Sequence, residues 1–286
     1  MIKYLLFSSI LVLSINLFKI LLVALTSKIY NENILKNINL KPKFMIMEFF
    51  SLSIIIAVAI WIIENYLILT NTKLLFSLFF ISLIPSYNFI ISPLKYLFSR
   101  QYKKSRKFEE IIKKKGFDYN IIVITGNVMN AYATGILPFS KTILIGEKLK
   151  NNMTENNLLS IIYHEIGHLK LNHLAKNYFI NIILSLISIL IFFIREYYFG
   201  KEEFSVFEPL SIFILGLSIG ICFWYIPGKV QYKSELEADY FASKIVGAEN
   251  YEKALMELDL LSNGDVSKGG ITHPKLSKRI ENIYKK

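Results

Sequence analysis

Long apolar runs dominate the pattern of hydrophobic and polar positions along this chain. A helix needs about 17 to 25 mostly apolar residues to cross a bilayer. Five runs reach or nearly reach that length, at residues 4–26, 46–70, 74–98, 178–194 and 210–226. We therefore predict an integral membrane protein with about five transmembrane helices.

Three of these runs contain residues that leave alternatives open. Lys3 precedes the first run as in a signal peptide, but Lys19 interrupts it and a poor cleavage site follows, which favours an uncleaved helix. The third run contains Pro85 and Pro93, which lack a backbone donor, so a kinked or re-entrant stretch is the alternative to a straight span. Glu64, in the second run, has polar neighbours that favour an interface position over a functional carboxylate.

Basic residues are concentrated in two connecting segments. Segment 27–45 carries four lysines, and segment 99–177 opens with a basic cluster. Because Lys and Arg are enriched in cytoplasmic loops, we predict both segments inside and the amino terminus outside. The predicted organisation is a membrane region at 1–98 with about three spans, a soluble segment at 99–177, two further spans at 178–226 and a second soluble segment at 227–286.

The first soluble segment has the hydrophobic pattern of a small sheet, followed by that of a helix. Apolar, β-favouring runs at 121–124, 131–134 and 142–145 are separated by glycines and a proline, which predicts a small antiparallel sheet. Thr154 offers an N-cap, and apolar residues then recur at helical spacing up to Leu169. The fold class predicted is therefore an α+β membrane protein.

That helix contains the sequence His164-Glu165-Ile166-Gly167-His168. Residues i and i+4 differ by about 40° around a helix, so both imidazoles can reach one metal ion, and Glu165 lies beside them. The pattern is typical of zinc hydrolases, in which zinc lowers the pKa of water towards ~7 and the glutamate is the general base. The alternative is a polar patch on an ordinary helix, which its apolar surroundings disfavour. His173 would lie about 180° from His164 on a continuous helix, so we expect it at the surface or an interface.

A catalytic zinc site needs a third protein ligand. Cys222 is the single cysteine, so histidines and carboxylates must supply the ligands. Glu235 and Asp239 share one face of a helix predicted after the fifth run, so Glu235 can bind the metal while Asp239 orients a histidine ligand. Glu237 points away from Glu235 and is predicted to be a solvated charge.

Four motifs taken together resemble the membrane-embedded zinc metallopeptidases that include CAAX prenyl protease 1 and the HtpX heat-shock protease. They are His-Glu-Ile-Gly-His-Leu-Lys-Leu-Asn-His at 164–173, Asn-Ala-Tyr-Ala-Thr-Gly at 130–135, Glu-x-x-x-Asp at 235–239 and His-Pro-x-x-x-x-Arg-Ile at 273–280. The resemblance covers residues 100–286. It implies a zincin-like catalytic unit of the gluzincin type, made from both soluble segments.

The resemblance also implies roles for individual residues. One zinc ion per chain would be held by His164, His168 and Glu235, with Glu165 as the general base and Asp239 against a histidine ligand. A strand would hold the substrate backbone by β-augmentation through Asn130, Ala131, Tyr132, Ala133 and Thr134. His273 would lie at the cleft and stabilise the oxyanion or hold substrate, with Arg279 in the same substrate-binding segment. The alternative for His273 and Arg279 is a helix start fixed by Pro274.

The net charge of +11 is the remaining global feature. No aromatic and basic module accompanies it, so we assign it to membrane topology and predict no nucleic-acid partner. The expected function is a membrane-bound zinc metalloendopeptidase that cleaves membrane-associated or hydrophobic polypeptides at the cytoplasmic face of a bacterial inner membrane. The bilayer and membrane-associated protein or peptide substrates are its expected partners. The alternatives are a dedicated CAAX-type prenyl protease and, from another class, a signal-transducing receptor with a protease output domain.

Overall fold

A computed structural model of the protein describes residues 5–6, 9–10, 13, 89–90, 93–94, 96, 102–126, 128–199, 207–221 and 225–285. The chain divides into two compact units. Unit 1 comprises Met1–Leu83 and Asn181–Pro227, and unit 2 comprises Ile84–Ile180 and Gly228–Lys286. All the motifs that carry the predicted chemistry therefore lie in unit 2.

One helix among the described residues is long and apolar enough to cross a membrane. It lies in α9 (His173–Phe199), where the stretch His173–Ile191 meets the requirement. The fifth apolar run contributes α10 (Phe207–Gly220), whose 14 residues are short for a span. Most of the first three runs, together with Glu64 and Cys222, lie outside the described residues, so the count of about five spans stays a prediction.

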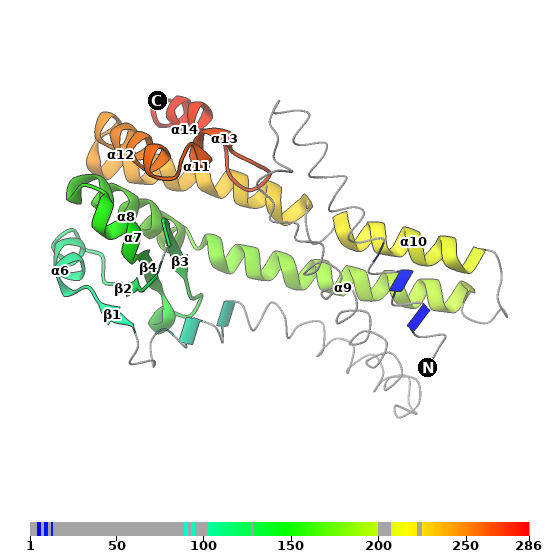
Figure 1. The fold of residues 1–286 in the computed structure, drawn as a ribbon. Helices are drawn as coiled ribbons and strands as arrows, with labels where there is room; N and C mark the ends of the chain where they lie inside the picture. Colours follow the sequence, from blue (N-terminus) through cyan, green and yellow to red (C-terminus); the bar gives the residue numbers. More distant parts are fainter. Residues whose placement is uncertain are drawn as a thin grey trace. The chain divides into compact units, whose positions relative to one another are not determined.

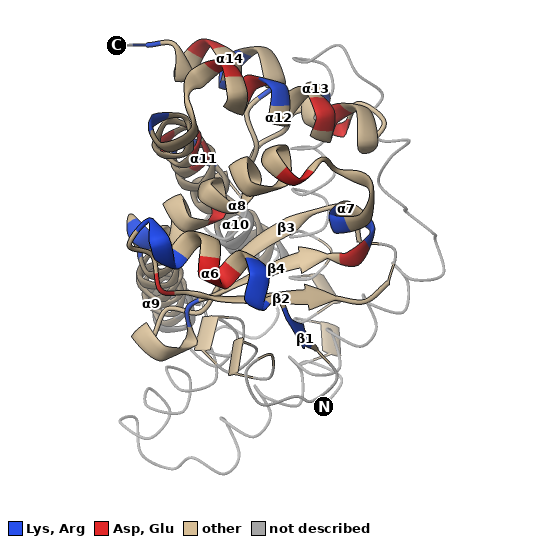
Figure 2. Cartoon of the chain, turned by 90° about the vertical axis from the view of Figure 1, so that its left-hand side faces the viewer, with Lys and Arg blue, Asp and Glu red and all other residues tan. Residues whose placement is uncertain are grey.

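Unit 2 contains a small mixed sheet. Its strands are β1 (Lys103–Lys104), β2 (Asn120–Ile124), β3 (Ala131–Thr134) and β4 (Thr142–Gly146), in the order β1-β2-β4-β3 (Figure 2). The β1–β2 and β3–β4 pairs are antiparallel, whereas β2 and β4 are parallel. The prediction of an antiparallel sheet is therefore wrong for the central pair. The reason is the strand order, because the chain forms β3 at the edge and then turns back to lay β4 beside β2.

A tight turn makes this return possible. Gly135 follows β3 with a φ of +86°, and a Cβ at that position would lie 2.1 Å from the backbone oxygen of Ser140. Only glycine combines the left-handed conformation with so close an approach. The short 3-10 helix η2 (Pro138–Ser140) then leads directly into β4.

Helices pack on the sheet and on one another to build the hydrophobic core of unit 2 (Figure 1). They are α6 (Arg106–Lys114), α7 (Glu147–Asn152), α8 (Glu155–Lys170), α11 (Ile226–Val246), α12 (Ala248–Leu261), α13 (Asp265–Lys268) and α14 (Leu276–Ile283). Helix α8 is central, since it contacts β3, β4, α7 and α12. Its residues Ile162 and Ile166 are fully buried, beside Ile143 and Ile145 of β4 in the same core cluster. The predicted metal-binding helix is thus held from several sides.

Both ends of α8 are fixed by side chains from other segments. Thr154 stands at the N-cap position, but its hydroxyl donates to Glu257 Oε2 of α12 at 2.8 Å instead of capping the helix. At the other end, the Lys141 ammonium donates to the carbonyl of Leu169 and to Asn172 Oδ1, both at 2.9 Å. Asn172 has a φ of 55°, which ends the helix and starts α9 in a new direction.

Helices α8 and α11 approach each other closely at Gly167. A Cβ there would lie 3.1 Å from Ala238 Cα and 3.2 Å from a ring carbon of Phe241. Ala238 lies between Glu235 and Asp239 on the buried face of α11. The missing side chain at Gly167 therefore lets the acidic face of α11 meet the histidine face of α8.

Candidate active site

Three side chains from α8 and α11 converge on one point. Nε2 of His164 and Nε2 of His168 lie 3.2 Å apart, and the Glu235 carboxylate lies 3.4 Å from each of these nitrogens. One donor atom from each residue falls within 4.8 Å of the others, and His164 and Glu235 are buried. Two imidazole nitrogens and one carboxylate are the donor set of a catalytic metal site with an open fourth position. The residues present can therefore hold a metal ion.

Asp239 lies behind His164, on the side away from this point. Its Oδ1 is 2.9 Å from His164 Nδ1, and the Arg279 guanidinium donates to both carboxylate oxygens, at 2.8 and 2.6 Å. The Tyr251 hydroxyl donates to Asp239 Oδ1 at 2.6 Å. Sequence analysis missed Tyr251, because its role depends on the contact between α12 and α8, which no local pattern reveals.

The buried carboxylates of this group favour a positive charge beside them. Burial acts to lower the pKa of His164, but hydrogen bonds and charges from Asp239 and Glu235 outweigh it and raise the pKa to about 10. Burial alone would raise the pKa of Asp239, but the charge and hydrogen bonds of Arg279 hold it well below its usual range. Hydrogen bonds from three histidines likewise hold the pKa of Glu235 well below its usual range, against the effect of burial. Both carboxylates are therefore negative at neutral pH.

His173 is part of the same cluster, which corrects the prediction made for it. The predicted rotation of about 180° assumed one continuous helix, whereas α8 ends at Lys170 and α9 begins at His173. His173 is buried, with Nδ1 at 3.1 Å from His168 Nδ1 and Nε2 at 3.0 Å from Glu237 Oε2. Glu237, predicted to be a solvated charge, is 41% exposed and makes this contact as well as an ion pair with Lys233.

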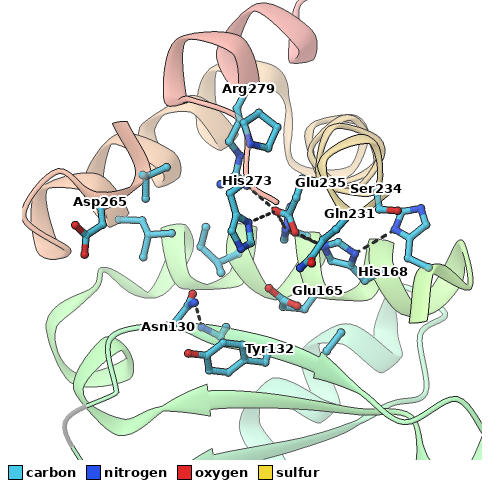
Figure 3. A pocket seen from close by; sticks show the side chains of 18 of the residues that line it. Asn130, Tyr132, Glu165, His168, Gln231, Ser234, Glu235, Asp265, His273 and Arg279 are labelled. Atoms are coloured by element: carbon cyan, nitrogen blue, oxygen red, sulfur yellow. Dashed lines mark hydrogen bonds and ion pairs between the residues drawn. The ribbon is translucent and has the colours of Figure 1, made fainter. Parts of the chain in front are cut away.

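A cavity of about 560 Å³ opens beside the converging side chains and is lined by residues of unit 2 alone. In Figure 3, Glu235 and His168 point toward each other, while the Glu165 carboxylate lies on the side of β3, near Asn130 and Tyr132. Ala131 and Ala133 of β3 also line the cavity, whereas Thr134 is outside the lining. Four of the five residues predicted to bind the substrate backbone therefore face the same cavity as Glu165.

His273 and Arg279 occupy different environments. The His273 side chain is 56% exposed in the cavity, with Nδ1 at 3.4 Å from Glu235 Oε2. The Arg279 side chain is 8% exposed, and its guanidinium is held by Asp239. Both residues line the cavity, Arg279 from within a buried ion pair and His273 with an exposed ring, and their roles toward substrate stay predictions.

The fold and the site together define a class of protein. One helix carries two histidines one turn apart and an adjacent glutamate that faces the cavity, and a second helix supplies a carboxylate. This combination is the metal-binding group of the HExxH metallopeptidases. The chain belongs to peptidase family M48, whose family model matches residues 98–286. This result confirms the resemblance to the family of CAAX prenyl protease 1 and HtpX.

Individual relatives agree with this assignment. Protease HtpX of Wigglesworthia glossinidia brevipalpis is 24% identical over 190 residues, covering 57% of this chain and 65% of HtpX. The probable CAAX prenyl protease 1 of Schizosaccharomyces pombe is 25% identical over 253 residues, covering 82% of this chain and 51% of the relative. CAAX prenyl protease 1 of Saccharomyces cerevisiae is 26% identical over 212 residues, covering 61% of this chain and 46% of the relative. The chain thus spans about half to two thirds of the length of these relatives.

The crystal structure of S. mikatae Ste24p has a similar fold. Its TM-score is 0.51 at 21% sequence identity, and the match covers 72% of this chain and 57% of Ste24p. At this level of identity the likeness concerns the fold alone. It supports the mostly helical architecture with a small sheet.

Proposed function

We propose that the protein is a membrane-bound zinc metalloendopeptidase. The observation that carries the proposal is the convergence of His164 Nε2, His168 Nε2 and the Glu235 carboxylate at the wall of the cavity that Glu165 also lines. Membership of peptidase family M48 supports it independently. Zinc is the metal we propose, because two imidazoles, one carboxylate and an open position are typical of catalytic zinc sites.

The residues have distinct roles in the proposed reaction. When bound, zinc supplies a Lewis acid that polarises the scissile carbonyl and makes water acidic enough to react near neutral pH. Glu165 takes the proton of the attacking water and passes it to the leaving amine. Asp239 accepts a hydrogen bond from His164 Nδ1 and so keeps Nε2 free for the metal, and Arg279 and Tyr251 fix Asp239 in turn.

His273 is placed to act on the oxyanion. Its exposed ring lies at the cavity, 3.4 Å from Glu235, and can donate a hydrogen bond to the oxygen on which negative charge develops. The Arg279 guanidinium is engaged by Asp239, so we propose that its main role is to hold that carboxylate.

The substrate is an extended polypeptide in this proposal. Strand β3 is the last strand in the order β1-β2-β4-β3 of the described sheet, and it pairs with β4 on one side. Gly146 donates to the carbonyl of Asn130, so the alternation of an antiparallel ladder turns the N–H and C=O groups of Ala131 and Ala133 to the cavity side. The Ala131 N–H donates there to Asn130 Oδ1 at 2.9 Å, so a substrate must displace that side chain to reach it. A peptide can add there as a further strand, with its scissile bond near Glu165.

The test is a metal analysis paired with a protease assay on detergent-purified protein. Wild type should hold one zinc per chain and degrade casein, a generally unfolded substrate. Glu165→Gln should keep the zinc and lose activity by orders of magnitude, because the side chain activates water without binding the metal. Glu155→Gln, at an exposed position in the first turn of the same helix, is the matched control. Loss of zinc in Glu165→Gln, or unchanged turnover, contradicts the assignment.

A dedicated CAAX-type protease is the second candidate. The observation that favours it is the match to the probable CAAX prenyl protease 1 of S. pombe, which extends over 82% of this chain. A farnesylated peptide ending in a CAAX sequence and its unmodified counterpart distinguish the candidates. Cleavage that requires the prenyl group supports the dedicated enzyme, and equal cleavage of both peptides supports the broader endopeptidase.

We propose further that the site faces the cytoplasm of a bacterial inner membrane. The proposal rests on the basic segments 27–45 and 99–177. In a Cys222→Ser background, a cysteine at Lys201 should react with an impermeant maleimide added outside intact cells, whereas a cysteine at Lys104 should react only after lysis. The reverse labelling would place the peptidase outside.

A further inference from the structure

We infer that His173 and Glu237 position His168 as a metal ligand, by fixing which of its ring nitrogens carries the proton. The three side chains form a continuous chain of contacts, from Glu237 Oε2 to His173 Nε2 at 3.0 Å and from His173 Nδ1 to His168 Nδ1 at 3.1 Å. The inference rests on the proposed metal site and adds two residues that act on the metal through His168.

The direction of each hydrogen bond follows from the carboxylate. An ionised carboxylate only accepts hydrogen bonds, so His173 must donate from Nε2 to Glu237. In a neutral imidazole the other nitrogen is then an acceptor, so Nδ1 of His173 presents a lone pair. His168 must therefore carry its proton on Nδ1 and donate it to His173. Its Nε2 is left as a lone pair, pointing toward His164 Nε2 and Glu235.

His164 and His168 are thus each oriented through Nδ1 by a carboxylate of α11, one directly and the other through a second histidine. Asp239 contacts His164 Nδ1 directly at 2.9 Å, from a fully buried position. Glu237 is half-exposed on the same helix and reaches His168 through one intervening imidazole. The turn at Asn172 makes this possible, because it places His173 against His168 where a continuous helix would carry it away.

Two replacements of His173 distinguish positioning from mere space filling. His173→Phe keeps a ring of similar size but removes both nitrogens, so it spares packing and deletes the acceptor. His173→Asn is smaller but can place its side-chain oxygen near the position of Nδ1, where it accepts from His168. If His173 only fills space, His173→Phe should bind zinc more tightly than His173→Asn. If His173 positions His168, His173→Asn should bind zinc more tightly than His173→Phe.

The experiment measures zinc affinity of the full-length, detergent-purified protein by competition with a chromophoric chelator. We expect His173→Phe to weaken zinc binding about 10- to 100-fold, as loss of a hydrogen bond behind a histidine ligand does, and His173→Asn to recover most of it. Glu237→Ala should weaken binding by up to about tenfold, since His173 can then adopt either tautomer. Lys233→Ala, which removes the other partner of Glu237, is the control and should bind as wild type does.

Cobalt substitution gives a second readout, which compares the ligand geometry of the two His173 variants. The visible absorption of bound Co²⁺ reports ligand geometry, so His173→Phe should change the spectrum while His173→Asn resembles wild type. Zinc affinity within about twofold of wild type in both His173→Phe and Glu237→Ala overturns the inference, as does weaker binding in His173→Asn than in His173→Phe. If His173→Phe does not fold, the half-exposed Glu237→Ala alone decides. Wild-type protein without zinc would instead contradict the proposed function.

Discussion

Gly167 of α8 lies directly against Ala238 of α11, so close that a Cβ on the glycine would stand 3.1 Å from the Ala238 Cα. The contact sets the separation of the two helices at the level of the metal-binding group. Backbone atoms cannot swing aside as the end of a flexible side chain can, so any side chain at Gly167 must move one helix relative to the other.

This contact predicts that Gly167→Ala lowers zinc affinity, by about tenfold or more, through displacement of Glu235 from His164 and His168. Intrinsic helix propensity alone predicts the opposite effect on stability, a gain of about 1 kcal/mol. Asn156→Ala, at an exposed position of α8, measures the effect of propensity without the helix contact. Zinc competition should therefore show weaker binding in Gly167→Ala alone, and thermal melting should report the effect of helix propensity in both variants. Unchanged zinc affinity in Gly167→Ala would show that α11 can shift without cost.

The register of α11 predicts different outcomes for its two central glutamates. Glu235→Ala should lose zinc affinity by several orders of magnitude, because it removes one of three protein ligands. Glu237→Ala should lose no more than about tenfold, because it acts only through His173. Zinc content after dialysis against a mild chelator measures both. If Glu237→Ala loses the metal and Glu235→Ala keeps it, the ligand assignment is wrong.

The open edge of β3 predicts that Ala133→Pro impairs substrate binding selectively. Proline removes the N–H that faces the cavity and leaves the ladder with β4 intact, since the bonds to β4 come from neighbouring residues. One lost hydrogen bond to the substrate backbone should lower kcat/KM by up to about tenfold, mainly through KM. Ala133→Gly, which keeps the N–H, is the control. An effect of equal size in both variants would argue against strand addition.

The hydrogen bonds of Glu257 predict that part of the free energy of unfolding depends on pH. Burial acts to raise the pKa of Glu257, but hydrogen bonds from the backbone N–H and hydroxyl of Thr154 and from the Asn157 amide outweigh it, so the pKa is lowered from 4.5. A lowered pKa means that the folded state favours the charged form. The contribution is therefore present above about pH 4.5 and is lost as the pH falls through the lower folded value.

Glu257→Gln should remove this component. Its melting temperature should lie below that of wild type at pH 6, and the difference should shrink as the pH falls below about 4.5. Glu249→Gln, an exposed residue at the start of α12, should follow wild type throughout. A difference that stays constant across this range would assign the loss to packing.

Parts of this arrangement could be predicted from local sequence. The three β-favouring runs correspond to β2, β3 and β4, with ends within one residue, and α8 begins directly after Thr154. The spacing of His164 and His168 is a property of any helix, and that of Glu235 and Asp239 likewise. These features depend on periodicity and capping, which nearby residues determine.

Other parts depend on contacts between distant segments. The parallel pairing of β2 with β4 follows from strand order, which alternation of side chains does not encode. The end of α8 is marked by Asn172 in a left-handed conformation that Lys141 holds from 31 residues away, without a glycine or proline to signal it. The place of His173 depends on that turn, and the role of Tyr251 depends on the packing of α12 against α8.

Unit 2 is interrupted in the chain by residues 181–227, and this has a consequence for the order of assembly. The segment before the interruption carries His164, Glu165 and His168, and the segment after it carries Glu235 and Asp239. During synthesis the first segment emerges as a half-site that lacks the carboxylate ligand. The proposed protease therefore cannot cut anything until the intervening helices have been made and the second segment has joined the first, so the nascent chain is protected from its own activity.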